Sequence, residues 1–315
     1  MSLKILAACA LVLLSSLVGQ AAERPASRVL VIGIDGCRAD ALKVAKIPHL
    51  KALIDVGAFS EATNIVGTRG DTADTVSGPG WSNVLTGVWA DKHGVTNNNF
   101  EVMHYDAFPH FFTHVKEAYP GAKTYSYCVW PPIHEKIVRS ADETKLFARA
   151  ADEGSCAAAD TRCAAQAVET LTKGDPDAMF VYLENVDDTG HRKGFHPTVP
   201  DYVQALEEVD GKVGQVIDAL HARPNYAQEN WLVIVATDHG GVGTGHGGGR
   251  MNPEVNTVFL IVSGADAAPG KIAGPTNHVD VVATALTHLG IAIKPEWGLD
   301  GHAVGLKADA GAKAK

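Results

Sequence analysis

The sequence predicts a single α/β domain in which helices flank a mostly parallel central sheet. The first indication is a set of short, continuous runs of β-branched and leucine residues, which are typical of strands buried on both faces. These runs lie at residues 28–34, 123–129, 178–183, 231–236 and 258–262. The second indication is that helical segments separate the runs, so that strands and helices alternate along the chain. No internal repeat or linker interrupts the alternation, and we expect one domain over residues 24–306.

The helices are predicted from the spacing of apolar side chains. Four of them are expected at residues 48–56, 141–172, 201–220 and 278–289. The second of these is rich in alanine and is interrupted near Gly154. A shorter helix begins at Trp81, and the polar residues 63–74 that precede it are expected to form a loop.

Composition and charge exclude one broad class of function. The 315 residues are 46% hydrophobic and 20% charged, as in an ordinary soluble globular protein. The net charge is −9 and the sequence has no run of lysine or arginine, which argues against a nucleic-acid-binding surface. The residues from 307 to 315 are rich in alanine, lysine and glycine, and we expect them to form a disordered tail.

The N-terminus has the pattern of a secretory signal peptide. Lys4 precedes an apolar run from Ile5 to Val18, and the small residues up to Ala21 offer a cleavage site. Such a run is too short and too weakly flanked for a stable membrane span. We therefore expect removal of residues 1–21, a periplasmic or secreted mature chain, and no stable membrane span after cleavage.

Export makes the cysteines informative, because an even number of them in an oxidising compartment favours disulfide bonds. Four cysteines remain after the expected cleavage. Cys156 and Cys163 are close in sequence and are the first predicted pair, which leaves Cys37 and Cys128 as the second.

Acidic and histidine residues follow three of the predicted strands. They are Asp35, Asp187, His191, Asp238 and His239. Ligands of open α/β sheets bind at the carboxyl ends of the strands, so we expect these side chains to lie close together. His246 follows in a glycine-rich loop that bends easily toward the same place. Any one of these residues alone has an ordinary structural explanation, such as capping a turn or packing in the core. Together they form a donor set that suits zinc, or Mn²⁺ or another divalent ion, and that divides into two sites.

A serine stands at the start of the short helix near Trp81. Ser77 lies in the sequence Ser-Gly-Pro-Gly, where a hydroxyl is held among small and rigid residues. Backbone N–H groups point outward from a helix N-terminus, which suits attack on an anionic substrate. The alternative is that Ser77 only caps the helix.

In this order, the motifs resemble those of the alkaline phosphatase superfamily, most closely its type I phosphodiesterase/nucleotide pyrophosphatase branch. The matching motifs are Gly33-Ile-Asp35-Gly36-Cys-Arg38, Ser77-x-Pro79, Thr86-Gly87, His93-Gly94-Val95, Asp187-x-x-Gly190-His191, Asp238-His239-Gly240 and His246-Gly247-Gly248. They extend over most of the chain after residue 28.

The resemblance implies a function and a role for each residue. One divalent metal, expected to be zinc, would be bound by Asp187, His191 and His246. A second would be bound by Asp35, Asp238 and His239, together with the Ser77 hydroxyl. Ser77 would attack the phosphorus of a small-molecule phosphoric ester and form a phospho-serine that water then hydrolyses. Asn98 falls where the family places an asparagine that donates a hydrogen bond to a non-bridging phosphoryl oxygen.

Two departures from the family pattern keep alternatives open. Family members usually place an aromatic residue after the nucleophile, where it helps to stack a nucleobase, but Gly78 stands there. The short interval between His239 and His246 is nearer the pattern of glycolipid phosphoethanolamine transferases. The Ser77-x-Pro79 motif also resembles sulfatases, although their conversion of the nucleophile to formylglycine requires an arginine where Trp81 stands. The alternatives are therefore a phosphomonoesterase or sulfatase on the same fold, or a non-catalytic binding protein that has kept the metal site.

His246 has one competitor as a metal ligand, which is His278. We expect His246 because the neighbouring Gly245, Gly247 and Gly248 allow a close approach of the backbone. His278 instead precedes an apolar helix that we expect to pack on the sheet.

Overall fold

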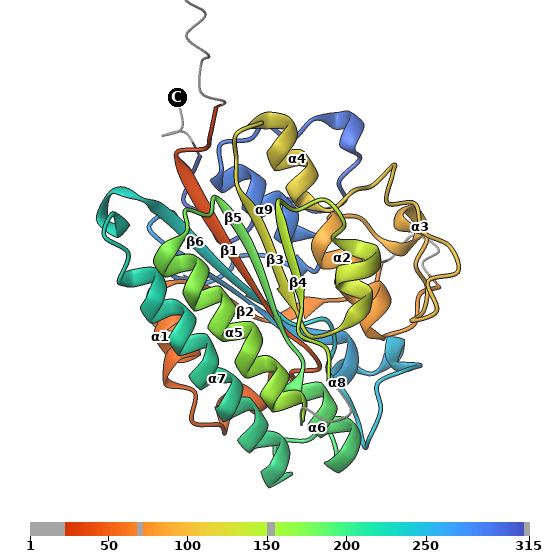
Figure 1. The fold of residues 1–315 in the computed structure, drawn as a ribbon. Coiled ribbons are helices and arrows are strands. Elements are labelled where there is room, and N and C mark those ends of the chain that lie inside the picture. Colours follow the sequence, from red (N-terminus) through yellow and green to blue (C-terminus); the bar gives the residue numbers. More distant parts are fainter. Residues whose placement is uncertain (1–22, 68–71, 150–154, 312–315) are drawn as a thin grey trace, which may run out of the picture.

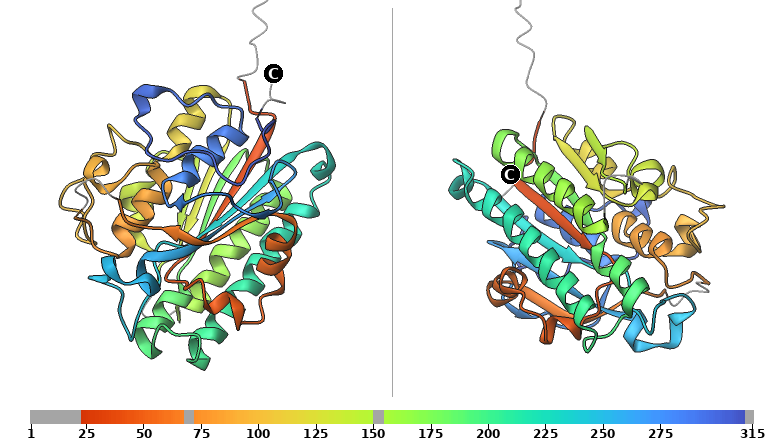
Figure 2. Two further views of the ribbon diagram at one scale, coloured as in Figure 1. Left: turned by 180° about the vertical axis from the view of Figure 1, so that it is seen from behind. Right: turned by 60° about the horizontal axis from the view of Figure 1, so that its bottom comes forward.

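A twisted sheet runs through the middle of the molecule, with helices on both of its faces (Figures 1 and 2). The computed structural model describes residues 23–67, 72–149 and 155–311. Within these residues the sheet has nine strands, in the order β4-β3-β5-β1-β6-β7-β2-β8, with β9 paired to β2. The strands are β1 (Ser27–Ile34), β2 (Ala58–Asn64), β3 (Thr124–Cys128), β4 (Glu143–Leu146), β5 (Ala178–Leu183), β6 (Asn230–Ala236), β7 (Thr257–Gly264), β8 (Gly270–Lys271) and β9 (Thr276–Asn277).

Five neighbouring strands, from β4 to β6 in the sheet order, run parallel to one another. β7 is antiparallel to β6 and to β2. All six residues of β5 are buried, as are nearly all of β1 and β6, because helices cover both faces of the sheet. This burial explains why the central strands read as continuous apolar runs in the sequence. The predicted fold class, one α/β sheet that is mostly parallel, is confirmed.

The helices form two layers. α5 and α7 pack against each other over one face, and α9 lies with α2 and α4 on the other (Figures 1 and 2). The helices are α1 (Pro48–Val56), α2 (Ser77–Thr86), α3 (Ala90–His93), α4 (Phe111–Ala118), α5 (Cys156–Lys173), α6 (Asn185–Lys193), α7 (Pro200–His221), α8 (Pro253–Asn256) and α9 (Asp280–His288). Short 3-10 or π turns occur at Ala41–Lys43, Ile133–Ile137, Tyr226–Gln228, Gly249–Met251 and Pro295–Trp297.

The prediction of a helix over residues 141–172 is wrong at its start. Residues 143–146 form β4, and the helix begins only at Cys156. β4 lies at the edge of the sheet and pairs only with β3, so its Glu-Thr-Lys-Leu sequence is half-exposed and lacks an apolar run. The polar loop predicted to begin at residue 63 is also shifted, because β2 continues to Asn64.

The predicted disulfides are absent from the described part of the chain. Cys37, Cys128, Cys156 and Cys163 are all free and buried. Cys156 and Cys163 lie seven residues apart in the same helix, which places their Cα atoms about 10 Å apart at 1.5 Å per residue. A disulfide needs Cα atoms within about 7 Å, so the helix separates the two thiols. Each thiol instead donates to an oxygen of the neighbouring strand segment, Cys156 to Glu184 Oε2 at 3.1 Å and Cys163 to the Tyr182 carbonyl at 3.5 Å.

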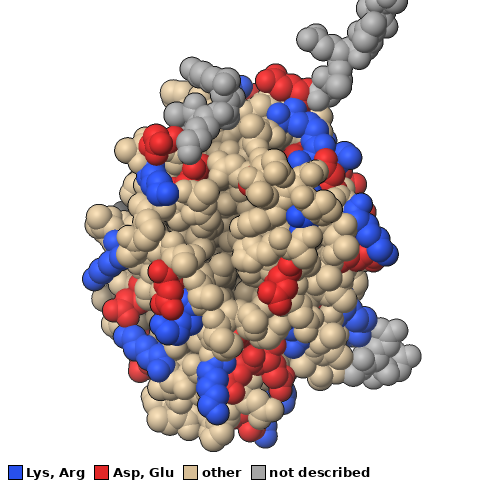
Figure 3. All heavy atoms as spheres, turned by 90° about the vertical axis from the view of Figure 1, so that its left-hand side faces the viewer, with Lys and Arg blue, Asp and Glu red and all other residues tan. Residues whose placement is uncertain are grey.

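The structure describes none of the expected signal peptide and only part of the expected C-terminal tail. The expected signal peptide, residues 1–21, lies outside the described residues. Of the expected disordered tail, residues 307–311 are described: residues 308–311 form a turn, and the Lys307 N–H donates to the Asp266 carbonyl at 2.8 Å. Residues 312–315 lie outside the described part of the chain. No helix among the described residues is both long and apolar enough to cross a bilayer. Acidic and basic side chains are interspersed on the face of the molecule shown in Figure 3.

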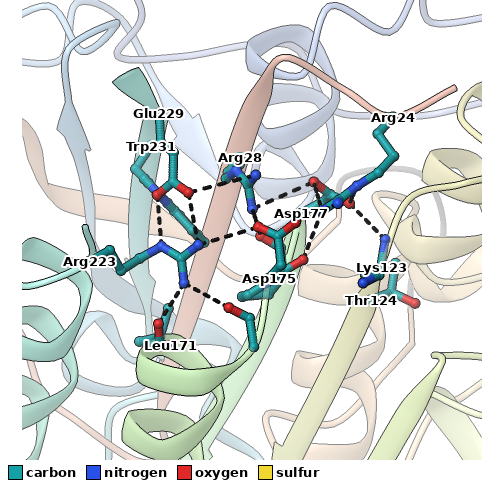
Figure 4. Close-up of polar contacts among 12 residues, drawn as sticks. Arg24, Arg28, Lys123, Thr124, Leu171, Asp175, Asp177, Arg223, Glu229 and Trp231 are labelled. Carbon is teal, nitrogen blue, oxygen red and sulfur yellow. Dashed lines mark hydrogen bonds and ion pairs between the residues drawn. The ribbon is translucent and has the colours of Figure 1, made fainter. Parts of the chain in front are cut away.

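The amino ends of the parallel strands are joined by a network of ion pairs (Figure 4). Three arginines face three acidic side chains there. They are Arg24, Arg28 and Arg223, with Asp175, Asp177 and Glu229. The Asp177 carboxylate is fully buried and accepts from two nitrogens of Arg24 at 2.8 Å and from the Lys123 N–H at 2.8 Å. Each carboxylate of this network therefore has an arginine partner.

Candidate active site

The candidate site residues predicted from the sequence lie together at the opposite edge of the sheet. Asp35 directly follows β1, and Asp238 and His239 are the second and third residues after the end of β6. Asp187 and His191 lie one turn apart in α6, which begins directly behind β5. Because β5, β1 and β6 are adjacent and parallel, their carboxyl ends bring these side chains into one place.

Two groups of side chains are close enough to hold a cation each. Asp35, Asp238 and His239 offer ligand atoms that all lie within 4.8 Å of one another. The same holds for Asp187, His239 and His246. The two groups share His239, whose ring stacks on that of His246 with the centroids 3.6 Å apart.

The three histidines share one hydrogen-bonding arrangement. Each Nδ1 lies 2.8–2.9 Å from a backbone carbonyl: that of Thr244 for His191, Gly240 for His239 and Thr75 for His246. A carbonyl only accepts, so each Nδ1 carries the proton and Nε2 of the neutral ring is a bare donor to a metal. Burial lowers the pKa of both His239 and His246 to about 3, which keeps these rings neutral.

The three aspartates each leave one carboxylate oxygen without a partner. Asp35 Oδ1, Asp187 Oδ1 and Asp238 Oδ2 are buried and accept no hydrogen bond from the described residues. Burial raises the pKa of Asp187 and Asp238 well above the usual range, and repulsion from Asp35 raises both further. Burial likewise raises the pKa of Asp35. Buried carboxylates without a cationic partner are costly, so free oxygens facing bare Nε2 atoms fit a site built for divalent cations.

His191 differs from the other two histidines. It is half-exposed, and it does not belong to either of the groups that lie within 4.8 Å. Its Nε2 is nevertheless 3.4 Å from Asp187 Oδ2 and 3.0 Å from His246 Nε2. The structure thus brings His191 beside Asp187 and His246, as the motif requires. His278 lies outside both groups, and its Nε2 donates to the Thr237 carbonyl at 2.9 Å.

Ser77 is the first residue of α2 and does not cap it. The N-cap is Val76, which has no side-chain capping bond. The Ser77 side chain is buried, and its Oγ lies 3.3 Å from His239 Nε2. The hydroxyl is therefore directed at the Asp35–Asp238–His239 group, and the capping interpretation is wrong.

Asn98 lies next to the same helix terminus. Its Oδ1 accepts from the Gly78 N–H at 2.6 Å, and this bond does not use the amide NH₂ group, which is the donor of the side chain. This loop approaches so closely that a Cβ on residue 78 would lie 2.7 Å from the Asn97 carbonyl oxygen and 2.9 Å from Asn98 Oδ1. The chain therefore requires glycine after Ser77, at the position where the family pattern has an aromatic residue.

Three further residues contact the site and were not assigned to it from the sequence. The indole N–H of Trp81 and the hydroxyl of Tyr182 both donate to Asp35. Thr75 holds the His246 loop, because its hydroxyl donates to the His246 carbonyl at 2.5 Å while its own carbonyl accepts from His246 Nδ1. The proximity of Thr75 to Ser77 in the sequence was the only available signal for this role.

Comparison with known proteins agrees with this geometry. A model of the family named type I phosphodiesterase / nucleotide pyrophosphatase matches residues 29–258. The chain belongs to this family. The matched range includes all the residues of the two groups, which lie between Asp35 and His246.

Two curated human relatives of the type I phosphodiesterase/nucleotide pyrophosphatase chain show how far the likeness extends. Ectonucleotide pyrophosphatase/phosphodiesterase family member 5 is 24% identical over 231 residues, which cover 68% of this chain and 44% of the relative. The catalytic subunit named GPI ethanolamine phosphate transferase 2 is 30% identical over 128 residues, which cover 40% of this chain and 13% of the relative. The chain thus spans less than half the length of either relative.

Solved structures share the fold. Murine ectonucleotide pyrophosphatase/phosphodiesterase 5 superposes with a TM-score of 0.64 at 18% identity, covering 85% of this chain and 96% of that one. A structure described as a 2-O GAG sulfatase gives a TM-score of 0.66 at 13% identity, covering 89% of this chain and 73% of that one. Phosphodiesterase-type and sulfatase-type proteins therefore both have this architecture.

Proposed function

We propose that this family member is an exported, metal-dependent hydrolase of small phosphoric esters that acts through a covalent phospho-serine on Ser77. The observation that carries the proposal is the convergence of free carboxylate oxygens and bare imidazole nitrogens beside the Ser77 hydroxyl. A site of this kind has little use in a protein that only binds a neutral ligand. This donor set and membership of the family both support a phosphoric ester hydrolase.

The residues present fit two divalent cations, and zinc suits the mixed imidazole and carboxylate donors. We assign one cation to Asp35, Asp238 and His239 together with the Ser77 hydroxyl. We assign the other to Asp187, His191 and His246. When bound, such cations favour the deprotonated form of a nearby hydroxyl and neutralise charge that develops on phosphoryl oxygens.

The protein's own groups then divide the chemistry. Ser77 Oγ forms a bond to phosphorus while the bond between phosphorus and the leaving oxygen breaks, and water later cleaves the Ser77 ester. Asn98 donates from its NH₂ group to a non-bridging oxygen, because Gly78 N–H already occupies Oδ1. The N-terminus of α2 points its backbone N–H groups toward the same anionic substrate.

The substrate is expected to be a diester or pyrophosphate without a stacked nucleobase at residue 78. Gly78 offers no ring, and Asn97 and Asn98 leave no room for one. The sulfatase alternative is favoured only by the shared fold. It is disfavoured by Trp81, whose buried indole occupies the position at which formylglycine formation requires arginine.

Turnover of three chromogenic substrates tests the proposal. Bis-p-nitrophenyl phosphate, p-nitrophenyl phosphate and p-nitrophenyl sulfate should be compared side by side at equal enzyme concentration. We expect kcat/KM to be highest for the diester. The highest value for the sulfate would support the sulfatase alternative instead, and no turnover of any of them would support a binding protein. Export is tested separately by finding the mature N-terminus after residue 21 in a periplasmic or secreted fraction.

A further inference from the structure

Only one of the two oxygens of the Asp35 carboxylate accepts hydrogen bonds from the described residues. Its Oδ2 accepts two hydrogen bonds, from the indole N–H of Trp81 at 2.9 Å and from the hydroxyl of Tyr182 at 2.5 Å. Its Oδ1 accepts none from the described residues and lies 3.6 Å from His239 Nε2. All three side chains, those of Asp35, Trp81 and Tyr182, are almost completely buried. The two oxygens of this carboxylate therefore differ: Oδ2 has two hydrogen-bond donors, and Oδ1 has none among the described residues.

The register of the sheet places the two donors. Gly33 of β1 pairs directly with Tyr182 of β5. Side chains two residues apart in a strand share a face, so Gly33 and Asp35 lie on the same side of the sheet as Tyr182. The Trp81 ring packs edge-on against the Tyr182 ring, with centroids 5.1 Å apart at 83°.

Gly33 makes room for the indole. A Cβ at residue 33 would lie 2.5 Å from Cη2 of Trp81 and 2.7 Å from Cζ3, closer than real atoms approach. Any side chain at residue 33 would push the indole away from the strand and from Asp35. The glycine in this strand is thus explained by the ring that lies across it.

Trp81 also connects two parts of the site. It lies four residues after Ser77 in α2, one helical turn along the same face. Its hydrogen bond to Asp35 joins the helix of the nucleophile to the strand that carries a proposed cation ligand. The position of Ser77 relative to the Asp35 group therefore depends in part on this bond.

We propose that Trp81 and Tyr182 are positioning residues that occupy Asp35 Oδ2 so that Oδ1 alone is presented to the cation. The inference rests on the proposed function. Two donors on Oδ2 compensate part of the desolvation of the buried carboxylate and fix its orientation. Neither residue touches the substrate or the reacting atoms in this scheme.

The opposite edge of the sheet supplies a matched control. The indole N–H of Trp231 donates to Glu229 Oε2 at 2.8 Å, which is the same kind of bond. Glu229 is also paired with Arg223 at 2.7 Å, so its charge is already neutralised. The variant W231F removes an indole–carboxylate bond without any expected effect on a cation site.

The test is a Zn²⁺ titration of chelator-treated protein by calorimetry, with the wild type, W81F, Y182F and W231F. We expect two binding steps in the wild type. In W81F and Y182F, one of the two steps weakens by about 10-fold or more while the other is unchanged. In the Co²⁺-substituted protein, the visible absorption bands of the same two variants shift. In W231F, the binding steps and the bands stay as in the wild type, although its thermal stability falls.

Two other outcomes would decide against the inference. If W81F and Y182F bind Zn²⁺ and Co²⁺ as the wild type does, Trp81 and Tyr182 do not position Asp35, and the proposed function is unaffected. If the wild type itself binds no Zn²⁺, the inference and the proposed function fail together. If W81F does not fold, Y182F decides, because it removes a single hydroxyl and keeps the ring that packs against Trp81.

Discussion

Both ends of the parallel strands carry acidic residues, but the ion-pair partners of these residues differ between the two ends. At the amino ends, Asp175, Asp177 and Glu229 face three arginines (Figure 4). At the carboxyl ends, the ion-pair partners of Asp35, Asp187 and Asp238 within the described residues are histidines. Burial lowers the pKa of His239 and His246 to about 3, so these two rings are neutral and supply no positive charge to the carboxylates.

The pKa shifts follow this difference. At the amino ends, the hydrogen bond from Arg223 lowers the pKa of Glu229. Burial opposes ionisation of Asp175, but the charges and hydrogen bonds of Arg24 and Arg28 outweigh it and lower the pKa to about 2. At the carboxyl ends, burial raises the pKa of Asp187 and Asp238. A paired carboxylate serves the fold, whereas an unpaired one costs stability and is explained by a ligand that supplies the charge.

The largest effect is expected at Ser77, which belongs to the carboxyl edge but carries no charge. Replacing it, S77A, should lower kcat/KM for bis-p-nitrophenyl phosphate by about 10³-fold or more, because the nucleophile is lost. Metal content and the circular dichroism spectrum should stay the same. Activity near that of the wild type, or a phospho-adduct trapped on another residue, would remove the covalent mechanism.

Neutralising one aspartate at each edge should change stability in opposite directions. At the amino edge, D177N leaves Arg24 without its buried partner and should lower the free energy of unfolding by about 2–4 kcal/mol. At the carboxyl edge, D238N removes an unpaired charge but keeps an oxygen to accept from the Gly36 N–H, so the metal-free protein should become more stable. Urea unfolding of chelator-treated protein measures both. A loss of stability in D238N similar to that in D177N would contradict the contrast between the edges.

Within the carboxyl edge, replacement of His246 tests which histidine is a metal ligand. H246A should weaken one of two metal-binding steps by about 10-fold or more, with activity partly restored by excess Zn²⁺. H278A is the control, since His278 is also buried but, among the described residues, its side chain bonds only to the Thr237 carbonyl. It should lower stability without changing metal affinity. If H278A weakens metal binding and H246A does not, the two assignments must be exchanged.

The smallest effect concerns Asp175, which is partly exposed at the amino edge. Its pKa in the folded protein, about 2, lies below the ordinary value of 3.8, so the ionised form stabilises the fold above about pH 4. This contribution is lost as the pH falls toward 2. D175N should therefore be less stable than the wild type at pH 7, by about 1 kcal/mol or less because solvent screens the pair, and no less stable at pH 2. A difference that persists undiminished at pH 2 would show that packing, not charge, is responsible.

Short-range sequence patterns were sufficient to predict the central strands and the acidic residues that follow them. Asp35 and Asp238 are placed by the fact that they end buried apolar runs, and parallel strands bring such ends together. The edge strand β4 could not be predicted in this way, because half-exposed strands have no continuous apolar run. The disulfide between Cys156 and Cys163 was predicted from expected export and from their closeness in sequence, and it is absent because a helix keeps the two residues two turns apart.

The supporting residues of the site were beyond the reach of sequence patterns for a different reason. Trp81 and Tyr182 meet at Asp35 only because Gly33 and Tyr182 are in register and α2 places the Trp81 ring against Gly33. Register and helix placement are set by the whole fold. Likewise, the role of Gly78 follows from the approach of the Asn97–Asn98 loop, which no local pattern indicates.

The central claim is that the unpaired carboxylates at the carboxyl edge bind two cations that phosphodiester hydrolysis requires. One measurement tests it most directly. Chelator-treated protein is titrated with Zn²⁺, and turnover of bis-p-nitrophenyl phosphate is followed at each addition together with the bound metal. The account predicts no turnover without metal and a maximum when about two ions are bound per chain. Full turnover in the chelator-treated protein, or no tight binding of Zn²⁺, would contradict it.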